Sequence, residues 1–227
     1  MKQPDPTEQR VVLSDVSWQQ FEALLHELGP NRTTRLTYSG RKLEMMSPLP
    51  EQTRCRKLID SLIQLVAEAQ AQPITAIAPV QLLHSDWRIA IAPSAIYYMG
   101  HNPTLDGITQ VQDEDGEAVV TLDVNQAAPP QLAIDIAINK RQLKPLPIYA
   151  SLGVSEVWCY QTFLGDDALK GELKIFNCQN DTYTEHRVSQ LLPSLTVQRI
   201  QDFLQHSEAM GLVKAIALVR EWASHPR

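Results

Sequence analysis

The sequence predicts a mixed α/β protein, and three of its segments carry this prediction. Residues 129–160, PPQLAIDIAINKRQLKPLPIYASLGVSEVWCY, have the pattern of a strand, a short loop, a helix and a second strand. Residues 33–46 have the pattern of a β-hairpin that turns at Ser39-Gly40. Residues 51–70 place apolar side chains at helical spacing. Strands and helices mixed in this way along one chain predict a mixed sheet with flanking helices.

The chain length is compatible with one large domain. With 227 residues, 44% hydrophobic and 20% charged, the composition is that of an ordinary soluble globular protein with a substantial core. Residues 1–13 are expected to form a flexible lead, and residues 14–227 a single domain. Within that domain, residues 100–130 are rich in Gly, Asp, Glu and Pro, which predicts a long acidic insertion.

The first helix and the long helix have clear end signals. Ser17 followed by Gln20 forms a capping-box pattern, and Gly29 ends the helix that this box opens. The long helix of residues 51–70 ends before Pro73. The other expected strands are 74–84, 88–99, 118–124, 172–177 and 182–188, and the other expected helices are 197–204 and 208–222.

Charge and composition exclude some classes of protein and disfavour others. The formal net charge of -6 disfavours sequence-independent binding to nucleic acid, because neutralising phosphates requires Lys and Arg. No apolar run is long enough to cross a bilayer, and the polar start lacks a signal-peptide core, so we expect a cytoplasmic protein. The three cysteines, Cys55, Cys159 and Cys178, are expected to be reduced thiols, and the six histidines lack zinc-site spacing.

A single carboxylate interrupts the first strand of residues 129–160. Alternate residues from Leu132 to Ile138 are apolar and share one face, whereas Asp135 lies on the opposite face. Two interpretations are open. Asp135 is either a metal ligand or a semi-buried structural acid, and in the second case its partner would be Lys140, Arg141, Lys144 or a backbone amide.

Several motifs together resemble the Uma-two family, whose members are regarded as endonucleases and are abundant in cyanobacteria. The resemblance spans about residues 16–222 and rests on RLTYSGRKLEMMSPLPEQ (35–52), PPQLAIDI (129–136) and LPIYASLGVSEVW (146–158). The segment SLTVQRIQDFLQHSEAMG (194–211) is similar to the closing helices of the family. The resemblance implies a restriction-endonuclease-like core of the PD-D/E-x-K superfamily.

The resemblance also implies a metal-dependent chemistry. In such nucleases carboxylates hold a divalent cation, usually Mg²⁺, which activates a water and stabilises the transition state of phosphodiester hydrolysis. A lysine or similar donor assists the attacking water. Residue by residue, Glu44 and Asp135 match the acidic positions of the family and are the metal ligands that the resemblance implies.

Other positions depart from the family pattern. Pro93 matches the proline of the P-D pair, but Ser94 stands at the aspartate position, and Ala137 stands where an Asp or Lys is expected. Further departures are Gln131, Gln52 and Pro145. Only Glu44 and Asp135 then remain to offer charge to a metal. The sequence therefore predicts an incomplete metal site, and a non-catalytic binding or assembly protein that keeps the nuclease fold (a pseudoenzyme).

The basic residues of the site region allow more than one interpretation. Lys140 or Lys144 could replace the missing basic catalyst, or the run from Lys140 to Lys144 could be a solvated surface. Glu44 could be a metal ligand, or an exposed acid on a strand whose neighbouring residues face the core. A second basic grouping could contact a DNA backbone or form an ordinary charged face; its members are Arg41, Lys42, Arg54, Arg56 and Lys57.

Three functions remain open at this point. The first is a non-catalytic protein with a protein partner or a second copy of itself. Its contact surface could be an apolar face of the C-terminal helices that includes Met210, Leu212, Val213, Ile216 and Trp222. The second is a working Mg²⁺-dependent DNA endonuclease that uses Glu44, Asp135 and either Lys140 or Lys144. The third is a nucleic-acid-binding module without cleavage.

Overall fold

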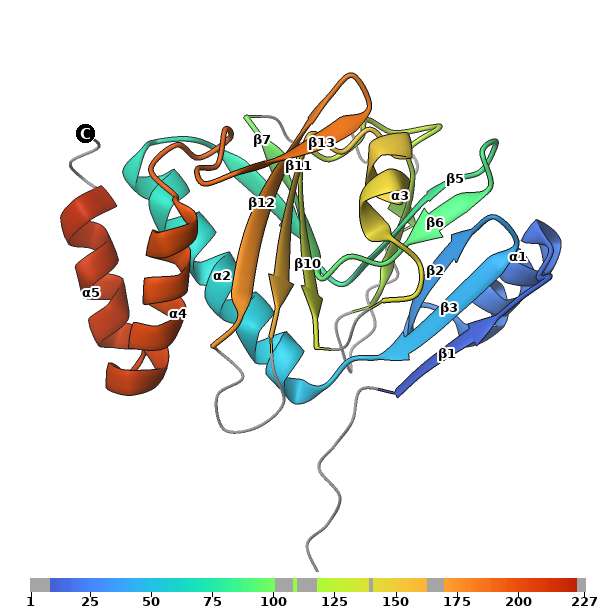
Figure 1. Cartoon of the computed structure of the whole chain (residues 1–227), viewed down its shortest axis with the longest axis horizontal. Helices are drawn as coiled ribbons and strands as arrows, with labels where there is room; N and C mark the ends of the chain where they lie inside the picture. Colours follow the sequence, from blue (N-terminus) through green and yellow to red (C-terminus); the bar gives the residue numbers. More distant parts are fainter. Residues whose placement is uncertain (1–8, 101–107, 110–117, 139–140, 163–169, 224–227) are drawn as a thin grey trace, which may run out of the picture.

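The computed structural model describes residues 9–100, 108–109, 118–138, 141–162 and 170–223. In this part of the chain two mixed β-sheets are surrounded by five helices (Figure 1). The prediction of a mixed sheet with flanking helices is therefore confirmed, although the strands are divided between two sheets. None of the described helices combines the length and the apolar character needed to cross a membrane.

The seven-stranded sheet has the order β1-β3-β2-β6-β5-β9-β8. Its neighbours pair antiparallel, except for the parallel pair β5 and β9. The predicted hairpin is confirmed as β2 and β3, and the short strand predicted at 118–124 is confirmed as β9. The strands are β1 (Gln9–Leu13), β2 (Arg35–Ser39), β3 (Lys42–Ser47), β5 (Val80–His84), β6 (Ile89–Ile91), β8 (Ile108–Thr109) and β9 (Val120–Asp123).

The six-stranded sheet has the order β13-β12-β11-β10-β7-β4. Its central pair, β10 and β11, is parallel and is connected through helix α3 (Pro145–Ser151), which confirms the predicted strand-loop-helix-strand unit. The strands are β4 (Ile74–Ile77), β7 (Ala95–Met99), β10 (Leu132–Ala137), β11 (Glu156–Gln161), β12 (Glu172–Gln179) and β13 (Thr182–His186).

The helices cover three different surfaces of these sheets. Helices α2 (Pro50–Ala69), α4 (Val197–Met210) and α5 (Leu212–Ala223) form one cluster against a face of the six-stranded sheet. Helix α3 packs on the opposite face of that sheet, and α1 (Trp18–Leu28) packs on the seven-stranded sheet. The capping box predicted at Ser17 and Gln20 opens α1.

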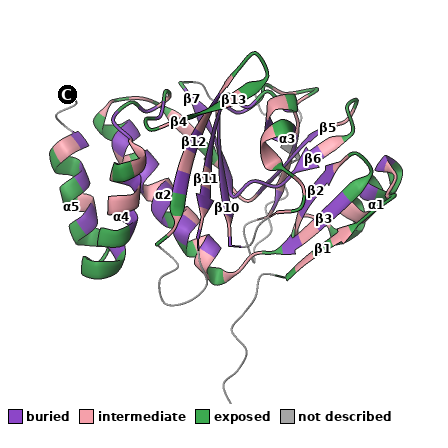
Figure 2. Ribbon diagram, viewed as in Figure 1, coloured by how far each residue is buried: buried purple, intermediate pink, exposed green. Residues whose placement is uncertain are grey.

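Strand β10 is buried on both faces because helices cover both (Figure 2). Leu132, Ile134 and Ile136 contribute to the cluster under α2, α4 and α5, whereas Ala133 contributes to the cluster under α3. The alternation of side chains predicted for this strand is therefore confirmed. It places Asp135 on the α3 face of the sheet.

Two predicted strands are each divided between the two sheets. Residues 74–84 form β4 and β5, separated at Pro79, and residues 88–99 form β6 and β7, separated at Pro93. Proline has no backbone N–H to donate to a strand ladder, so it interrupts the pairing at both places. At each proline the chain passes from one sheet to the other, and Ser94 lies directly after the second crossing.

The ends of the chain also differ from the prediction. Residues 9–13 were expected to belong to a flexible lead, but they form β1, which pairs antiparallel with β3. Helix α4 continues to Met210 rather than ending at residue 204, and α5 begins at Leu212. The break between them is Gly211, whose φ of 86° is readily adopted by glycine. The acidic run 113–117 of the predicted insertion lies outside the described residues.

A buried carboxylate that the sequence analysis did not identify holds the loop before α4. Glu156, the first residue of β11, is fully buried and accepts hydrogen bonds from Trp158 Nε1 and Ser189 Oγ, both at 2.6 Å. Its second oxygen accepts bonds from the backbone N–H groups of Gln190 and Leu191 at 2.7 and 3.4 Å. These donors are neutral, and they tie β11 to a loop more than 30 residues later in the chain.

Candidate active site

Glu44 lies on the central strand of a three-stranded segment, between two arginines on the same face. In the register of the sheet, Glu44 is opposite Val12 of β1 and Thr37 of β2. Arg10 lies two residues before Val12, and Arg35 lies two residues before Thr37. Since side chains two residues apart share a strand face, both arginines lie diagonally next to Glu44.

The carboxylate of Glu44 is buried and already accepts several hydrogen bonds. Its side chain is 2% exposed, so the interpretation of Glu44 as an exposed acid is wrong. One oxygen forms an ion pair with the Arg10 guanidinium, and the other accepts bonds from the backbone N–H groups of Gln142 and Leu143 at 3.0 and 3.2 Å. Glu44 thus connects β1, β3 and the segment that leads into α3.

Asp135 is also buried and paired. Its Oδ1 lies 2.5 Å from Nη2 of Arg141, and Tyr149 in α3 donates its hydroxyl to Oδ2 at 3.4 Å. The structural partner of Asp135 is therefore Arg141, one of the alternatives that the sequence left open. Burial acts to lower the pKa of Arg141, but the nearby Asp135, Tyr149 and Glu44 together outweigh it, so the pKa is raised.

The two acids thus converge on one guanidinium. Asp135 forms an ion pair with Arg141, and the charge of Glu44 is close enough to raise the pKa of the same arginine. The Arg141 side chain is 6% exposed, so the reading of this basic run as solvated surface is wrong at Arg141. Arg141 therefore pairs directly with Asp135 and interacts electrostatically with Glu44, the two acids that the family resemblance implies as metal ligands.

Ser94 takes part in the same network through its hydroxyl. Ser94 Oγ accepts hydrogen bonds from Nη1 of Arg35 at 2.8 Å and from the backbone N–H of Ile136 at 3.1 Å. The backbone N–H of Ser94 donates to the carbonyl of Ile134 at 2.7 Å. The residue at the position of the family aspartate therefore contacts an arginine and the strand of Asp135.

Arg35 is a buried cation in a crowded electrostatic environment. Burial and the nearby Arg141 lower its pKa to about 10, although the charge of Asp135 acts in the opposite direction. The guanidinium remains protonated at neutral pH. Its lowered pKa means that burying a positive charge at this position is costly.

A cavity of about 220 Å³ lies beside this network, between β2, the start of α2 and the Pro93-Ser94 crossing. Arg32, Arg35 and Arg56 line it together with hydroxyl and amide side chains. Among the described residues that line the cavity, none is acidic. The other lining residues are Thr33, Thr34, Pro48, Thr53, Pro79, Val80, Gln81, Ala92, Pro93, Ser94 and Val119.

The remaining predicted site residues do not all lie in this network. Ala137 ends β10 and presents no polar side chain. Lys144 is the exposed N-cap residue of α3 and lines a separate groove. Lys140 lies outside the described residues. Within the described part of the chain, no group of three or more His, Cys, Asp and Glu residues has an arrangement that could hold a metal ion.

The second basic grouping is dispersed in the structure. Arg41 forms an exposed ion pair with Asp15, and Arg54 forms one with Glu208. Lys42 and Lys57 are exposed. Arg56 is the member of the grouping that lines the cavity beside Ser94. The grouping is therefore divided between two elements, with Arg41 and Lys42 at the hairpin and the other three residues in the first turns of α2.

Two residues that the sequence analysis did not propose for the site are part of it. Arg10 was assigned to the flexible lead, and Arg35 was read only as part of a hairpin motif. The signal that could have identified Arg35 is its parity with Glu44 across the predicted hairpin, because both side chains fall on one face. Gln52 also supports the site: it caps α2 through the Leu49 N–H at 2.8 Å and donates to the Ile136 carbonyl at 3.0 Å.

Comparison with known proteins gives one line of support for the fold. No family model matches the sequence, and no curated protein matches it. A solved structure from Anabaena variabilis ATCC 29413, described as a "putative nuclease belonging to DUF820", is similar to this chain with a TM-score of 0.52 and 13% sequence identity. The similarity covers 83% of this chain and 99% of that one. The chain therefore has a nuclease-like fold, in agreement with the fold that its motifs imply.

Proposed function

We propose that this nuclease-fold protein is a non-catalytic binding protein of the Uma-two type, in which arginines have replaced the metal ion. The observation that carries the proposal is the pairing of both acids: Asp135 with Arg141, and Glu44 with Arg10 and two backbone amides. Each carboxylate thus has a guanidinium as its counter-charge, Arg10 for Glu44 and Arg141 for Asp135, where a divalent cation would provide the positive charge in an active relative.

The residues present do not fit a magnesium ion. Mg²⁺ requires oxygen ligands in near-octahedral geometry and binds through one or two carboxylates. Here both oxygens of Glu44 and Oδ1 of Asp135 already accept bonds from cations or backbone N–H groups. At the remaining family positions, Ser94 provides a hydroxyl that contacts Arg35, and Ala137 provides no ligand. Metal binding would require the displacement of a buried arginine.

Burial gives a second argument against metal exchange at this position. The side chains of Arg10, Glu44, Asp135 and Arg141 are between 2% and 9% exposed. Breaking one of these pairs leaves an uncompensated buried charge, which is strongly unfavourable. A dissolved metal ion would therefore compete against an internal counter-ion that is attached to the chain.

The test is a comparison of metal binding and DNA cleavage in the wild-type chain and in restored variants. We expect calorimetry with Mg²⁺ and Mn²⁺ to detect no binding by the wild type, and plasmid DNA to remain uncut. Ser94→Asp with Ala137→Lys should not restore binding, because Arg141 still neutralises Asp135. Adding Arg141→Ala to these two changes should permit metal binding. A wild-type chain that binds metal, nicks plasmid, and loses both properties in Glu44→Ala and Asp135→Ala is instead an endonuclease.

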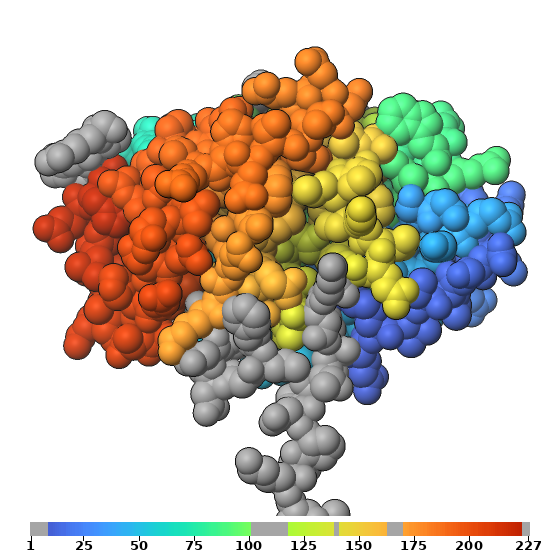
Figure 3. Space-filling model, in the orientation of Figure 1, coloured from blue at the N-terminus to red at the C-terminus, as the bar shows by residue number. Residues whose placement is uncertain are grey.

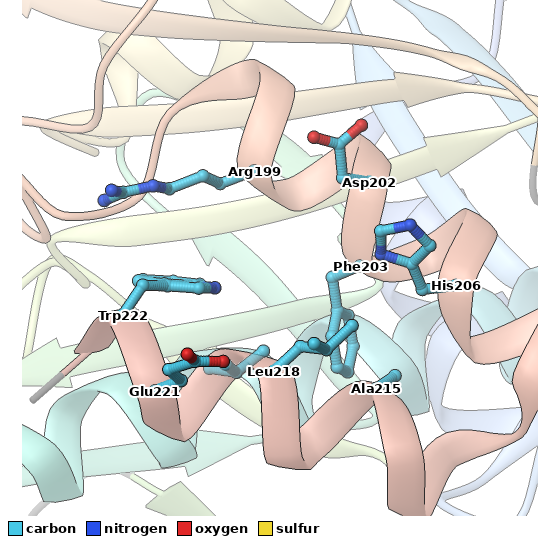
Figure 4. Close-up of a pocket in the computed structure, with 9 residues that line it drawn as sticks. Arg199, Asp202, Phe203, His206, Ala215, Leu218, Glu221 and Trp222 are labelled. Carbon is cyan, nitrogen blue, oxygen red and sulfur yellow. The ribbon is translucent and has the colours of Figure 1, made fainter.

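The C-terminal helices offer a surface for a protein partner. Val213 is 83% exposed, and the nearby Met210 and Leu212 are each 38% exposed. Ile216 and Trp222 instead pack against the core, so the apolar face predicted there is only partly exposed. A cavity of about 510 Å³ lies between α4 and α5, and Arg199 stacks over Trp222 in it at 4.5 Å (Figure 4).

A second, open groove is lined partly by apolar side chains. It lies between α3 and the edge formed by β11, β12 and β13, and it has a volume of about 1050 Å³. Figure 3 shows this face of the molecule, with α3 beside the strands β12 and β13. Leu146 and Phe176 contribute apolar surface there, and Lys144 and Lys174 contribute charge. Neither this groove nor the α4–α5 cavity contacts the paired acids.

A further inference from the structure

The cavity beside Ser94 has the opposite polarity to a metal site. Arg32, Arg35 and Arg56 line it, and the hydroxyl or amide groups of Thr33, Thr34, Thr53, Gln81 and Ser94 add further hydrogen-bonding groups. Among the described residues of its lining, none carries a carboxylate. In a chain with a formal net charge of -6, three arginines around one small cavity are a marked local excess of positive charge.

Arg32 has donors that the described structure does not use. Its Nη1 donates to the carbonyl of Gly29 at 2.7 Å. Its Nε and Nη2 are buried and have no hydrogen-bond partner among the described residues. Buried donors without partners are rare, because each loses its hydration without compensation. Two such N–H groups on one guanidinium have the spacing that binds two oxygens of one anion.

Arg35 adds a second guanidinium whose burial has a cost. Its pKa is lowered to about 10 by burial and by the neighbouring Arg141, so the folded chain holds this charge against an unfavourable environment. Ser94 Oγ accepts from one of its nitrogens, which fixes the guanidinium at the cavity. An anion in the cavity would relieve the repulsion between the cations.

The size of the cavity suits a small anion. Its volume of about 220 Å³ is below the roughly 300–1,000 Å³ of sites for drug-sized ligands. A phosphate group with at most a short organic substituent fits this space. Guanidinium groups bind phosphate oxygens in pairs, which suits the arginine-rich lining.

We propose that the cavity formed by Arg32, Arg35, Arg56 and Ser94 binds the phosphate group of a small anion, either inorganic phosphate or a small phosphomonoester. This inference adds a ligand class to the proposed binding role. It rests on the proposed function only in one respect, which is that the bound ligand is not cleaved. Ser94 is the residue that links the two: a serine at the family aspartate position leaves the cavity lining without that negative charge.

The test is calorimetry of the full chain with sodium phosphate and with glycerol phosphate, at neutral pH and constant ionic strength. Sodium acetate and sodium chloride serve as comparison anions. We expect saturable binding of phosphate, weakened about tenfold or more in Arg32→Ala, as follows from the loss of a charge-assisted hydrogen bond. Ser94→Asp should abolish the binding, because it places a carboxylate in the cavity beside Arg35.

Arg54→Ala is the matched control. Arg54 lies two residues before Arg56 on α2, but it is exposed and does not line this cavity. The control removes a charge of the same kind from the helix that carries Arg56, so it should leave phosphate binding unchanged. Circular dichroism and thermal unfolding establish that each variant is folded. If Arg32→Ala does not fold, Arg56→Ala replaces it with the same expected weakening.

The outcomes distinguish between the two possible ligands. They also distinguish a failure of this inference from a failure of the proposed function. Tighter binding of glycerol phosphate assigns a phosphomonoester, and tighter binding of phosphate assigns the inorganic ion. No saturable binding at millimolar phosphate, equal binding of acetate, or equal weakening by Arg54→Ala overturns the inference. Phosphate binding together with metal-dependent cleavage would preserve this inference and overturn the proposed function. If the chain neither binds phosphate nor cleaves DNA, this inference is overturned and the proposed function is preserved.

Discussion

The guanidinium of Arg141 lies 2.5 Å from the carboxylate of Asp135, and the two side chains are 6% and 3% exposed. The pair is therefore shielded from solvent and from ions in solution. In water such a pair would contribute little, but in the interior each charge depends on the other. This dependence makes the pair accessible to mutational tests.

Removal of Arg141 alone should destabilise the protein strongly. Arg141→Ala leaves Asp135 buried without a cation, and we expect a loss of about 3–5 kcal/mol in the free energy of unfolding. Urea denaturation followed by circular dichroism measures this loss. The double variant Arg141→Ala with Asp135→Ala should lose less than the sum of the single changes, because neither charge remains.

Arg54→Ala is the control for this series as well. The pair of Arg54 with Glu208 has an N–O distance of 3.7 Å, and its arginine is 57% exposed. Its removal should cost no more than about 1 kcal/mol, as for other exposed pairs. A loss in Arg141→Ala as small as that in Arg54→Ala would contradict the buried-pair interpretation.

Glu156 should tolerate neutralisation poorly, although it has no cationic partner in its hydrogen-bonding set. Glu156→Gln replaces one accepting oxygen by an NH₂ group that faces either Ser189 and Trp158 or two backbone N–H groups. A donor facing donors leaves buried groups unsatisfied, so we expect a loss of about 1–3 kcal/mol. Thermal unfolding of this variant, beside the exposed-site control Glu172→Gln, measures the effect. Equal melting temperatures for the two variants would refute the prediction.

The affinity for a phosphomonoester should pass through a maximum between acidic and strongly alkaline pH. The second ionisation of the ligand, with a pKa of about 6, raises its charge as pH increases. Near pH 10 the affinity should fall, because burial and Arg141 lower the pKa of Arg35 to about 10, whereas Asp135 and Tyr149 act to raise it. Calorimetry with glycerol phosphate across this range measures the profile. Affinity that stays constant between pH 8 and pH 10.5 would argue against a contribution of Arg35.

The three cysteines should differ in reactivity. All are free thiols, as predicted from the sequence. Burial raises the pKa values of Cys55 and Cys159 strongly and raises that of Cys178. Since the thiolate is the reactive form, a disulfide reagent at pH 8 should label Cys178 first, and Cys55 only after unfolding. Mass spectrometry of digested samples identifies the labelled residues, and rapid labelling of Cys55 in the folded chain would contradict its burial.

Much of the fold follows from local signals in the sequence. The capping box at Ser17, the hairpin turn at Ser39-Gly40 and the alternation around Asp135 each depend on residues close together in the chain. Short-range periodicity is enough to predict such elements. Pro79 and Pro93 lie inside the two segments, 74–84 and 88–99, that are each predicted to be one long strand. The structure shows that both prolines mark crossings between the sheets.

The composition of the site was less accessible from the sequence. Asp135 and Glu44 could be identified through the motifs, and Arg141 was one of several possible partners of Asp135. The pairing of Glu44 with Arg10 is missed because residues 9–13 fall in the predicted lead, although Val11 and Val12 are residue types typical of strands. The sequence indicates only the loss of an acid at Ser94, whereas its contact with Arg35 joins residues 59 positions apart in the chain.

The bonds from Gln142 and Leu143 to Glu44 join segments almost 100 residues apart. Such contacts form only after long loops have closed, and chains dominated by them fold slowly. The network formed by Glu44, Asp135 and their arginine partners thus joins strands of the seven-stranded sheet to the connection after β10. Its assembly is a late event by this reasoning, so changes within it should accelerate unfolding more than they retard folding. We therefore expect the residues that resemble the remnant of a catalytic centre to determine how long the native state persists.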